Sequence, residues 1–384
     1  MKIVYVIDSL ASRGGAERIL SEKMGYLALY DKYEVYVITC YQNPAQQLNA
    51  YPLSEKVHQI DLNIPYYSQY HYRYPVRLWK KWEIYRTLKN KLTATVQSID
   101  PDVLTGLGYF QADVVTGIQC RAKKIVELHE ARIFTMSDQG LSRSLFSRLY
   151  MRIYRWNYFR TVERQADVVV SLTKGDAYQW RKAKRVEVIP NFTMMPVADG
   201  QLPREKRVIA VGRLEWQKGF DRLIDLWAIV GKHYPDWHLD IFGFGSLEKA
   251  LRQQISSLGL KNQVSIQPFT EHIREEYLRS SVFVLTSRFE GFSLVLLEAS
   301  QNGLPSVAFD CPFGPSDLIE DGQSGFLVPN GDTKAFVERL ESLLDNESLR
   351  QCFSQHAINY VQKFRVNTIM QQWETLFETL CKKY

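Results

Sequence analysis

No apolar run in this chain of 384 residues is long enough to span a bilayer, because none approaches the ~18 residues that a transmembrane helix needs. After Met1-Lys2, the apolar run at residues 3–7 is also too short for the core of a signal peptide, and no cleavage site follows it. Secretion and membrane spanning are therefore not expected, and the chain is predicted to be cytoplasmic.

Cysteine is scarce as well. The five cysteines form no CxxC pair and no spacing typical of metal ligands, and their odd number fits a compartment in which thiols stay reduced. A DxD pair within a loop that could hold a metal ion is also absent, so no metal site is predicted. The net charge of +6 is modest and no nucleic-acid recognition motif accompanies it, so nucleic acid is not an expected partner.

What the chain does contain is an alternation of short β-branched runs and amphipathic stretches, which is typical of parallel sheets covered by helices. The runs form two series, at residues 3–7, 35–38, 103–104, 125–126 and 168–170, and at residues 208–211, 239–242, 264–266, 282–285 and 306–309. Because a chain of this length exceeds the ~250–300 residues that one core serves, each series is predicted to form its own α/β domain.

The segment at residues 189–204 separates the two series. It contains three prolines and no sustained periodicity, which suits a connection between domains. We place the boundary near residue 200, with an N-terminal domain at residues 1–195 and a C-terminal domain at residues 200–366.

Three loops follow predicted strands and carry candidate binding groups. The first strand leads into Gly14 and Gly15, just before a predicted helix, where free N–H groups and the helix dipole favour an anion. Taken alone, this glycine pair fits a purely structural tight turn equally well. The strand at residues 208–211 leads into Gly212, and two cations, Arg213 and Lys218, follow within one loop that could neutralise a diphosphate. Taken alone, that loop could also be a solvated basic segment.

The third loop lies at residues 286–299. Ser293 is a suitable N-cap, so the backbone N–H groups of Leu294 and Val295 are expected to point outward at a helix start. Glu290 and Glu298 flank this start, near the carboxyl end of a parallel strand, where open α/β sheets bind ligands. Two carboxylates there can accept hydrogen bonds from sugar or ribose hydroxyls.

Taken together, Gly212-Arg213 with Lys218-Gly219, followed by Glu290 and Glu298 in the frame EGFSLVLLEA, resemble the retaining glycosyltransferases of family four. The resemblance covers nearly the whole chain, since residues 14–18 look like the family's N-terminal glycine loop and the order of the motifs matches. It implies the GT-B fold, in which two Rossmann-like, doubly wound parallel-sheet domains face an interdomain cleft. It also implies that the last helix, residues 367–384, packs back on the first domain.

The resemblance assigns roles to individual residues. Arg213 and Lys218 would hold the donor diphosphate, Glu298 would bind ribose, and Glu290 would contact the donor sugar. The remaining donor-binding positions that it implies are Gly14, Gly15, Gly212, Gly243, Phe269, Gly291, Phe292, Ser293, Leu294 and Val295.

His129 is the candidate catalytic residue of the N-terminal half. It stands at the end of a predicted strand and matches a family histidine that faces the sugar across the cleft. Glu130 follows it where relatives often have Asp or Asn, and a buried structural histidine is the alternative.

The resemblance implies transfer of a hexose or N-acetylhexosamine from a nucleotide sugar to a glycan or lipid-linked oligosaccharide, as in surface polysaccharide or glycoconjugate synthesis. Residues 311–319 resemble a segment of relatives that transfer galactose or N-acetylgalactosamine, which favours a UDP-linked donor. Because the cationic loop already supplies the compensating charge, we expect no cofactor and activity that survives EDTA. A UDP-sugar epimerase of the same fold and an inactive nucleotide-sugar-binding scaffold are the alternatives.

Two stretches of the N-terminal half combine basic and aromatic residues. Residues 142–164 read as a helix with an apolar stripe and a second, basic face, formed by Leu145, Leu149, Ile153 and Trp156 and by Arg148, Arg152 and Arg155. Residues 66–91 mix aromatic and basic side chains, namely Tyr70, Tyr72, Trp79, Trp82 and Tyr85 with Arg73, Arg77, Lys80, Lys81, Arg86 and Lys89. Such segments suit peripheral docking to an anionic membrane at the inner face of the cell. Core stripes with solvated arginines are the alternative.

Overall fold

The computed structural model describes the chain except residues 43–48, 66–67, 69–70, 74–75, 133–144, 199–202 and 383–384. The chain forms two compact units. Unit 1 comprises Met1–Pro190 and Ile369–Tyr384, and unit 2 comprises Asn191–Thr368.

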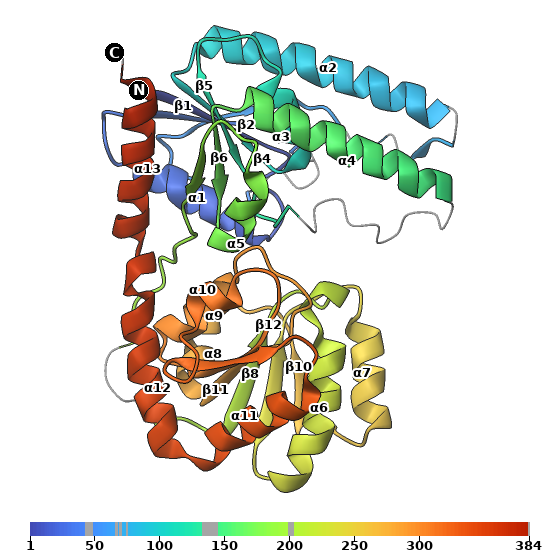
Figure 1. Cartoon of the computed structure of the whole chain (residues 1–384), viewed down its shortest axis with the longest axis vertical. Helices are drawn as coiled ribbons and strands as arrows, with labels where there is room; N and C mark the ends of the chain where they lie inside the picture. The colour runs from blue at the N-terminus through green and yellow to red at the C-terminus, as the bar shows by residue number, and fades with distance from the viewer. Residues whose placement is uncertain are drawn as a thin grey trace. The chain divides into compact units, whose positions relative to one another are not determined.

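Unit 1 is built on a parallel seven-stranded sheet with the strand order β3-β2-β1-β4-β5-β6-β7 (Figure 1). Its strands are β1 (Lys2–Ile7), β2 (Glu34–Thr39), β3 (His58–Asp61), β4 (Val103–Leu107), β5 (Lys123–Glu127), β6 (Val168–Ser171) and β7 (Val186–Val188). The sequence predicted the five inner strands but not β3 and β7. These two are short edge strands that are not fully buried, so they lack the apolar runs on which the prediction depended.

Helices cover both faces of this sheet. They are α1 (Gly15–Leu27), α2 (Val76–Ile99), α3 (Tyr109–Thr116), α4 (Leu145–Gln165), the short α5 (Lys174–Ala177) and α13 (Val366–Cys381). Val4 and Val6 of β1 pack with Leu88 and Leu92 of α2. Tyr5 points to the opposite face because side chains alternate along a strand, and there its ring lies near Lys23 of α1, which also contacts Trp373 of α13.

Unit 2 contains a parallel six-stranded sheet in the order β10-β9-β8-β11-β12-β13 (Figure 1). Its strands are β8 (Arg207–Val211), β9 (His238–Phe242), β10 (Val264–Gln267), β11 (Val282–Leu285), β12 (Ser306–Asp310) and β13 (Gly325–Pro329). Its helices are α6 (Phe220–His233), α7 (Glu248–Ser257), α8 (Ile273–Arg279), α9 (Leu294–Gln301), α10 (Pro315–Leu318), α11 (Thr333–Asp345) and α12 (Glu347–Tyr360). The edge strand β13 was not predicted.

The strand order confirms the predicted pair of doubly wound parallel sheets, and it also locates the ligand-binding end of unit 2. The chain winds outward from β8 in one direction and resumes at β11 on the other side of β8. The loops after β8 and β11 therefore diverge at the carboxyl ends of two neighbouring strands, which is where open α/β sheets form a crevice.

The last helix starts in unit 2 and continues into unit 1. From Ile369 onward it belongs to unit 1, where Trp373 lies against Lys23 and Glu374 accepts a hydrogen bond from Lys32 at 2.8 Å. The domain limits predicted from the sequence stay a prediction. In the described part of the chain, no helix is both long enough and apolar enough to cross a membrane.

Candidate functional site

The loops after β8 and β11 are fastened to each other. Arg288 N–H donates to the Gln217 carbonyl oxygen at 2.7 Å, and Gln217 Nε2 donates to the Phe289 carbonyl oxygen at 3.0 Å. Thr286 Oγ1 donates to the Gly219 carbonyl oxygen at 3.0 Å. Gly219 has φ +66°, and any Cβ there would collide with the Thr286 carbonyl oxygen, so this close approach requires glycine.

Lys218 and Glu290 meet between these loops. Lys218 Nζ lies 2.7 Å and 3.0 Å from the two carboxylate oxygens of Glu290, and the side chains are 14% and 5% exposed. Ser287 Oγ donates a further hydrogen bond of 2.6 Å to Glu290. An ammonium group has three N–H donors, so Lys218 can keep Glu290 and still donate to a ligand.

Arg213 contrasts with Lys218, because its side chain is exposed and makes no hydrogen bond or ion pair with the described part of the chain. Glu215 is a charged residue that interacts with it electrostatically. Hydrogen bonds from Ser246 lower the pKa of Glu215 from its usual value, and Arg213 lowers it further. The structure thus brings Lys218 and Glu290 together but does not place Arg213 in contact with either.

Arg288 lies in the loop after β11, and the sequence analysis assigned it no role. Its guanidinium donates to both carboxylate oxygens of Asp221, at 2.9 Å and 2.6 Å, and to the Trp216 carbonyl oxygen at 2.6 Å. It also stacks on the Trp216 ring at 4.5 Å from the centroid. The Arg288 guanidinium therefore helps to join the two loops. The position of Arg288 in the sequence does not reveal this role.

Helix α9 begins at the same place. Ser293 is its N-cap residue as predicted, but its side chain makes no capping hydrogen bond, and its buried Oγ has no partner in the described part of the chain. The first N–H groups of a helix have no intrahelical acceptor, so those of Leu294 and Val295 are available. Phe292 is buried against Phe364, with ring centroids 5.7 Å apart, so this position can offer a ligand only its backbone.

The segment after β12 packs against this helix start. Glu290 N–H donates to the Pro312 carbonyl oxygen at 2.9 Å, and Phe313 N–H donates back to Glu290 at 3.2 Å. Burial raises the pKa of the neighbouring Cys311 thiol, and the Glu290 carboxylate raises it further. Residues 311–313 therefore hold the backbone around Glu290 and Gly291 in place.

Glu298 lies in the second turn of α9 and is almost completely buried. Tyr277 of α8 donates to its Oε2 at 3.3 Å. A buried carboxylate needs strong hydrogen-bond donors, and hydroxyl groups of a ligand could supply them.

Gly243 follows the end of strand β9, and Phe269 follows the end of strand β10. A Cβ at position 243 would collide with the Gly212 carbonyl oxygen, so glycine lets the loop after β9 pass against the loop after β8. Phe244 and Phe269 form an edge-to-face pair with centroids 6.2 Å apart, and the two residues are 47% and 41% exposed. Sequence reasoning gave Phe244 no role, although it stands between two glycines at a strand end.

The other candidates belong to unit 1. Gly14 is the N-cap of α1 and Gly15 its first residue. Ser12 Oγ donates to Glu17 at 2.5 Å, so an internal carboxylate already lies at this helix start. Gly14, Gly15 and His129 are thus in unit 1, and all other predicted site residues are in unit 2.

His129 follows β5 and lies next to the buried ion pair of Lys23 and Glu127. Its Nε2 is 3.2 Å from Glu127 Oε1, although the ring N–H is not aligned with that oxygen, and its Nδ1 has no partner in the described part of the chain. Glu127 in turn accepts two hydrogen bonds from Lys23, at 2.7 Å and 2.5 Å. Burial alone would raise the pKa of Glu127, but Lys23 and His129 outweigh it and lower the value to about 2.

Sequence reasoning assigned no role to Lys23 or Glu127. The available signal is a charged residue at the buried end of the strand KKIVE and a lysine on the buried face of an amphipathic helix. Neither position shows in the sequence which partner it has.

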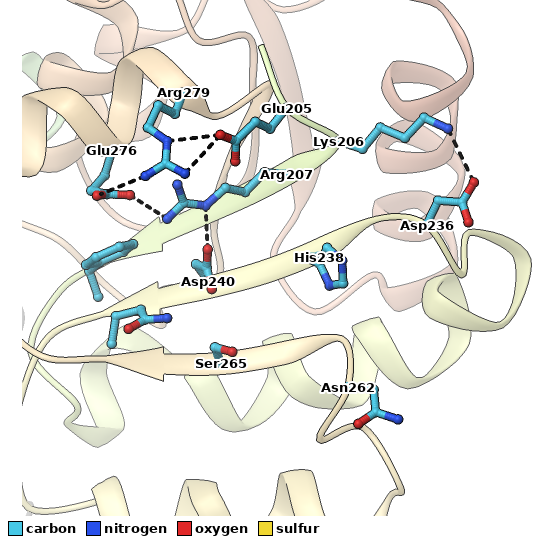
Figure 2. A pocket seen from close by; sticks show the side chains of 12 residues that line it. Glu205, Lys206, Arg207, Asp236, His238, Asp240, Asn262, Ser265, Glu276 and Arg279 are labelled. Atoms are coloured by element: carbon cyan, nitrogen blue, oxygen red, sulfur yellow. Dashed lines mark hydrogen bonds and ion pairs between the residues drawn. The ribbon is translucent and has the colours of Figure 1, made fainter.

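A pocket of about 620 Å³ lies elsewhere, along one face of β8, β9 and β10 (Figure 2). Arg207 at its centre pairs with Asp240 and Glu276, and Arg279 pairs with Glu276 and Glu205. Because these charges neutralise one another, we assign no ligand to it. Among the described residues, no group of His, Cys, Asp and Glu side chains could hold a metal ion.

Comparison with known proteins indicates the class of enzyme to which the chain belongs. Residues 198–360, which include both fastened loops and α9, match the family described as glycosyl transferases group 1. The chain is a glycosyltransferase. Its class of enzyme thus agrees with the prediction.

The glycosyltransferase is similar over nearly its whole length to two named glycosyltransferases. It is 28% identical to the amylovoran biosynthesis glycosyltransferase AmsD of Erwinia amylovora, over 98% of this chain and 99% of AmsD. It is 26% identical, over 97% of both chains, to an α-1,4-N-acetyl-D-galactosaminyltransferase of Campylobacter jejuni whose named substrate is a GalNAc-containing diNAcBac-PP-undecaprenol.

Solved structures confirm the fold. Anabaena HepE in complex with UDP and glucose aligns with a TM-score of 0.74 at 20% identity, over 99% of this chain and 100% of HepE. The glycosyltransferase has the GT-B fold, as predicted.

Proposed function

We propose that this chain is a retaining glycosyltransferase of family four that transfers a hexose or N-acetylhexosamine from a UDP-sugar. The acceptor is a glycan or a lipid-linked oligosaccharide of surface polysaccharide or glycoconjugate synthesis. The observation that carries this proposal is the Lys218–Glu290 pair between two fastened loops, at the start of α9 and at the switch point of the unit 2 sheet. Cations and free helix N–H groups at such a point suit a diphosphate.

In this proposal the site divides into parts that recognise different groups of the donor. Lys218 and the exposed Arg213 neutralise the diphosphate together with the N–H groups at the start of α9. Glu298 accepts hydrogen bonds from the ribose hydroxyls, and Glu290 accepts them from the sugar. The exposed pair Phe244 and Phe269 offers an apolar surface to the nucleotide base.

The proposed reaction keeps the anomeric configuration through substitution on the front face of the sugar. The bond between the anomeric carbon and the diphosphate oxygen breaks while a bond to the acceptor oxygen forms on the same face. The acceptor proton passes to the departing phosphate oxygen. Negative charge grows on the diphosphate in this step, so Arg213 and Lys218 stabilise the transition state more than the bound donor.

The proposed donor and acceptor follow from the relatives. UDP is bound in HepE, and the Campylobacter relative is named for a lipid-linked acceptor. Residues 311–313, part of the segment that favours UDP-linked galactose or N-acetylgalactosamine, contact the backbone of Glu290. We propose that the protein works in the cytoplasm without a metal ion.

A screen of nucleotide sugars by thermal shift tests the donor, because a ligand that binds only the folded state raises the apparent Tm. The best donor is then incubated with lipid-linked or polysaccharide acceptors, and NMR of the product gives the anomeric configuration. We expect UDP release to require an acceptor. Inversion of configuration would refute the retaining mechanism, and sugar isomerisation without an acceptor would instead favour the epimerase.

We further propose that unit 1 docks on an anionic membrane through α2 and α4, which lie side by side (Figure 1) and are joined by Lys81 Nζ at 5.1 Å from the Tyr154 ring centroid. Trp79 and Trp82 of α2 and Trp156 of α4 are each 56–58% exposed. If these tryptophan rings packed into the core of unit 1, they would be buried. The side chains of Leu145 and Arg148, and all of Tyr70, lie outside the described residues.

Each of these tryptophan rings also carries a cation. The distances to the ring centroids are 4.7 Å for Lys80 on Trp79, 5.4 Å for Arg86 on Trp82 and 4.8 Å for Arg160 on Trp156. Indole rings with adjacent cations suit the headgroup layer of an anionic bilayer, where each cation contributes about 1 kcal/mol. A lipid-linked acceptor would be reached from that surface.

Sedimentation with vesicles of phosphatidylglycerol and phosphatidylcholine at low salt tests the docking. We expect wild-type protein to sediment, and the triple variant Trp79→Ala, Trp82→Ala, Trp156→Ala to stay in the supernatant. Tyr178→Ala, which removes another exposed ring of unit 1, is the matched control and should sediment like wild type. Equal sedimentation of the triple variant would rule out this surface.

A further inference from the structure

The ion pair between Lys23 and Glu127 lies next to His129, and its burial inside unit 1 costs desolvation free energy. Lys23 is fully buried and Glu127 is 1% exposed, yet both are charged groups inside unit 1. Replacing such a pair by apolar residues of similar volume is often neutral or stabilising, so a buried pair is weak grounds for a purely stabilising role. Stabilisation of the fold alone therefore does not explain why this pair is present.

The surroundings hold the pair in one geometry. Lys23 Nζ lies 3.8 Å from the centroid of the Trp373 ring and 5.3 Å from that of Tyr5. Burial raises the pKa of the Tyr5 hydroxyl well above its usual value, and the Glu127 charge raises it further, so Tyr5 stays neutral. Groups from α1, α13 and β1 thus surround the Lys23–Glu127 pair, and His129 Nε2 lies 3.2 Å from Glu127 Oε1.

His129 is the residue that this carboxylate can act on. Its side chain is 10% exposed, Nε2 lies 3.2 Å from Glu127 Oε1, and both ring nitrogens are buried without an aligned hydrogen bond to any described residue. In a neutral imidazole one nitrogen donates and the other accepts, and a carboxylate beside one nitrogen keeps the proton there. Catalytic hydrogen bonds are often poorly aligned without substrate, so a small ring rotation can complete this one.

We propose that Glu127, charge-balanced by Lys23, is a positioning residue that holds the His129 proton on Nε2 and thereby presents Nδ1 as an acceptor for a substrate hydroxyl. This inference rests on the proposed sugar transfer for the identity of the substrate. The assignment of the two ring nitrogens can be tested without any substrate.

The spectroscopic test uses full-length protein labelled with ¹⁵N in the histidine rings, with the His129 signals assigned by their loss in His129→Gln. We expect the Nε2–H form in wild type. In Lys23→Met, Glu127→Leu, which replaces the pair by apolar side chains, the ring should become a mixture of both neutral forms. Wild type in the Nδ1–H form, or an unchanged ring in the variant, would overturn the proposal.

The kinetic test measures kcat and donor KM in the same variants after thermal melting has shown that they fold. We expect Lys23→Met, Glu127→Leu to lower kcat by about tenfold to a hundredfold, within the range of a general acid–base contribution, with donor KM changed by less than about threefold. Lys23→Met, Glu127→Gln, whose amide oxygen can still accept from Nε2, should recover part of kcat. Tyr5→Phe is the matched control in the same cluster and should keep wild-type kcat.

A double-mutant cycle separates positioning from general damage. If the pair acts through His129, the change Lys23→Met, Glu127→Leu should lower kcat no further in a His129→Gln background. A further drop of equal size there would show an independent structural effect and overturn the proposal. If wild type transferred no sugar from any donor, the proposed function would fail, whereas the ring spectra would still decide the positioning role.

Discussion

Arg213→Ala should lower the catalytic rate strongly while it leaves the stability of the fold almost unchanged. We expect kcat at saturating donor to fall by about 10²-fold, as for loss of one donor that stabilises developing charge, which corresponds to ~2.7 kcal/mol in the transition state. The Arg213 side chain is exposed and has no hydrogen bond or ion pair with the described part of the chain, so its removal leaves no buried group without a partner. The free energy of unfolding should therefore change by no more than about 0.5 kcal/mol.

The assay compares initial rates of acceptor-dependent UDP release across donor concentrations, together with the Tm of each protein. Lys249→Ala is the matched control, because it removes another exposed cation of unit 2 that lies on α7. A uniform loss of donor binding would raise KM and leave kcat unchanged. Wild-type kcat in Arg213→Ala, or an equal loss in Lys249→Ala, would refute the assignment of Arg213 to the diphosphate.

The remaining predictions concern the buried charges and the absence of a metal. Lys218→Met should lower the free energy of unfolding by up to about 3 kcal/mol in urea titrations, because it leaves the Glu290 carboxylate buried, whereas adding Glu290→Gln should restore most of it. Glu298→Gln should raise the donor KM about tenfold with a small change in kcat, and an unchanged KM would exclude ribose binding. Since the pKa of Glu127 is lowered to about 2, its ionised form stabilises the folded state above pH ~4.5, and this contribution of about 3 kcal/mol is lost as the pH falls toward 2. Melting curves from pH 7 to pH 3 should show the larger part of that loss in wild type but not in Lys23→Met, Glu127→Gln. Dialysis against EDTA should leave the transfer rate unchanged, and a loss restored by Mg²⁺ or Mn²⁺ would contradict metal independence.

The sequence by itself determined the class of fold. Buried parallel strands are short runs of β-branched residues, and the inner strands of both sheets carry this pattern clearly enough to be read in order. The edge strands β3 and β7 were missed because partly exposed strands need no such run, and β13 was missed although it contains the apolar run Phe326-Leu327-Val328. Loops that follow strand ends could be located as candidate binding loops for the same reason, since the carboxyl ends of parallel strands share one edge of a sheet.

Helical periodicity was less decisive. It predicted an apolar stripe on α4, but the same stripe fits a core face or an exposed docking face. Leu149, Ile153 and Trp156 are exposed, which only the packing of unit 1 decided.

Tertiary structure alone decided which charges act together. Lys218 and Glu290 are 72 residues apart, and Lys23 and Glu127 are 104 residues apart. Their pairing depends on which strands are neighbours and which helix covers them, and no local propensity encodes that choice. The same holds for Arg213, because its lack of a partner among the described residues is a property of the surrounding packing and not of its own loop.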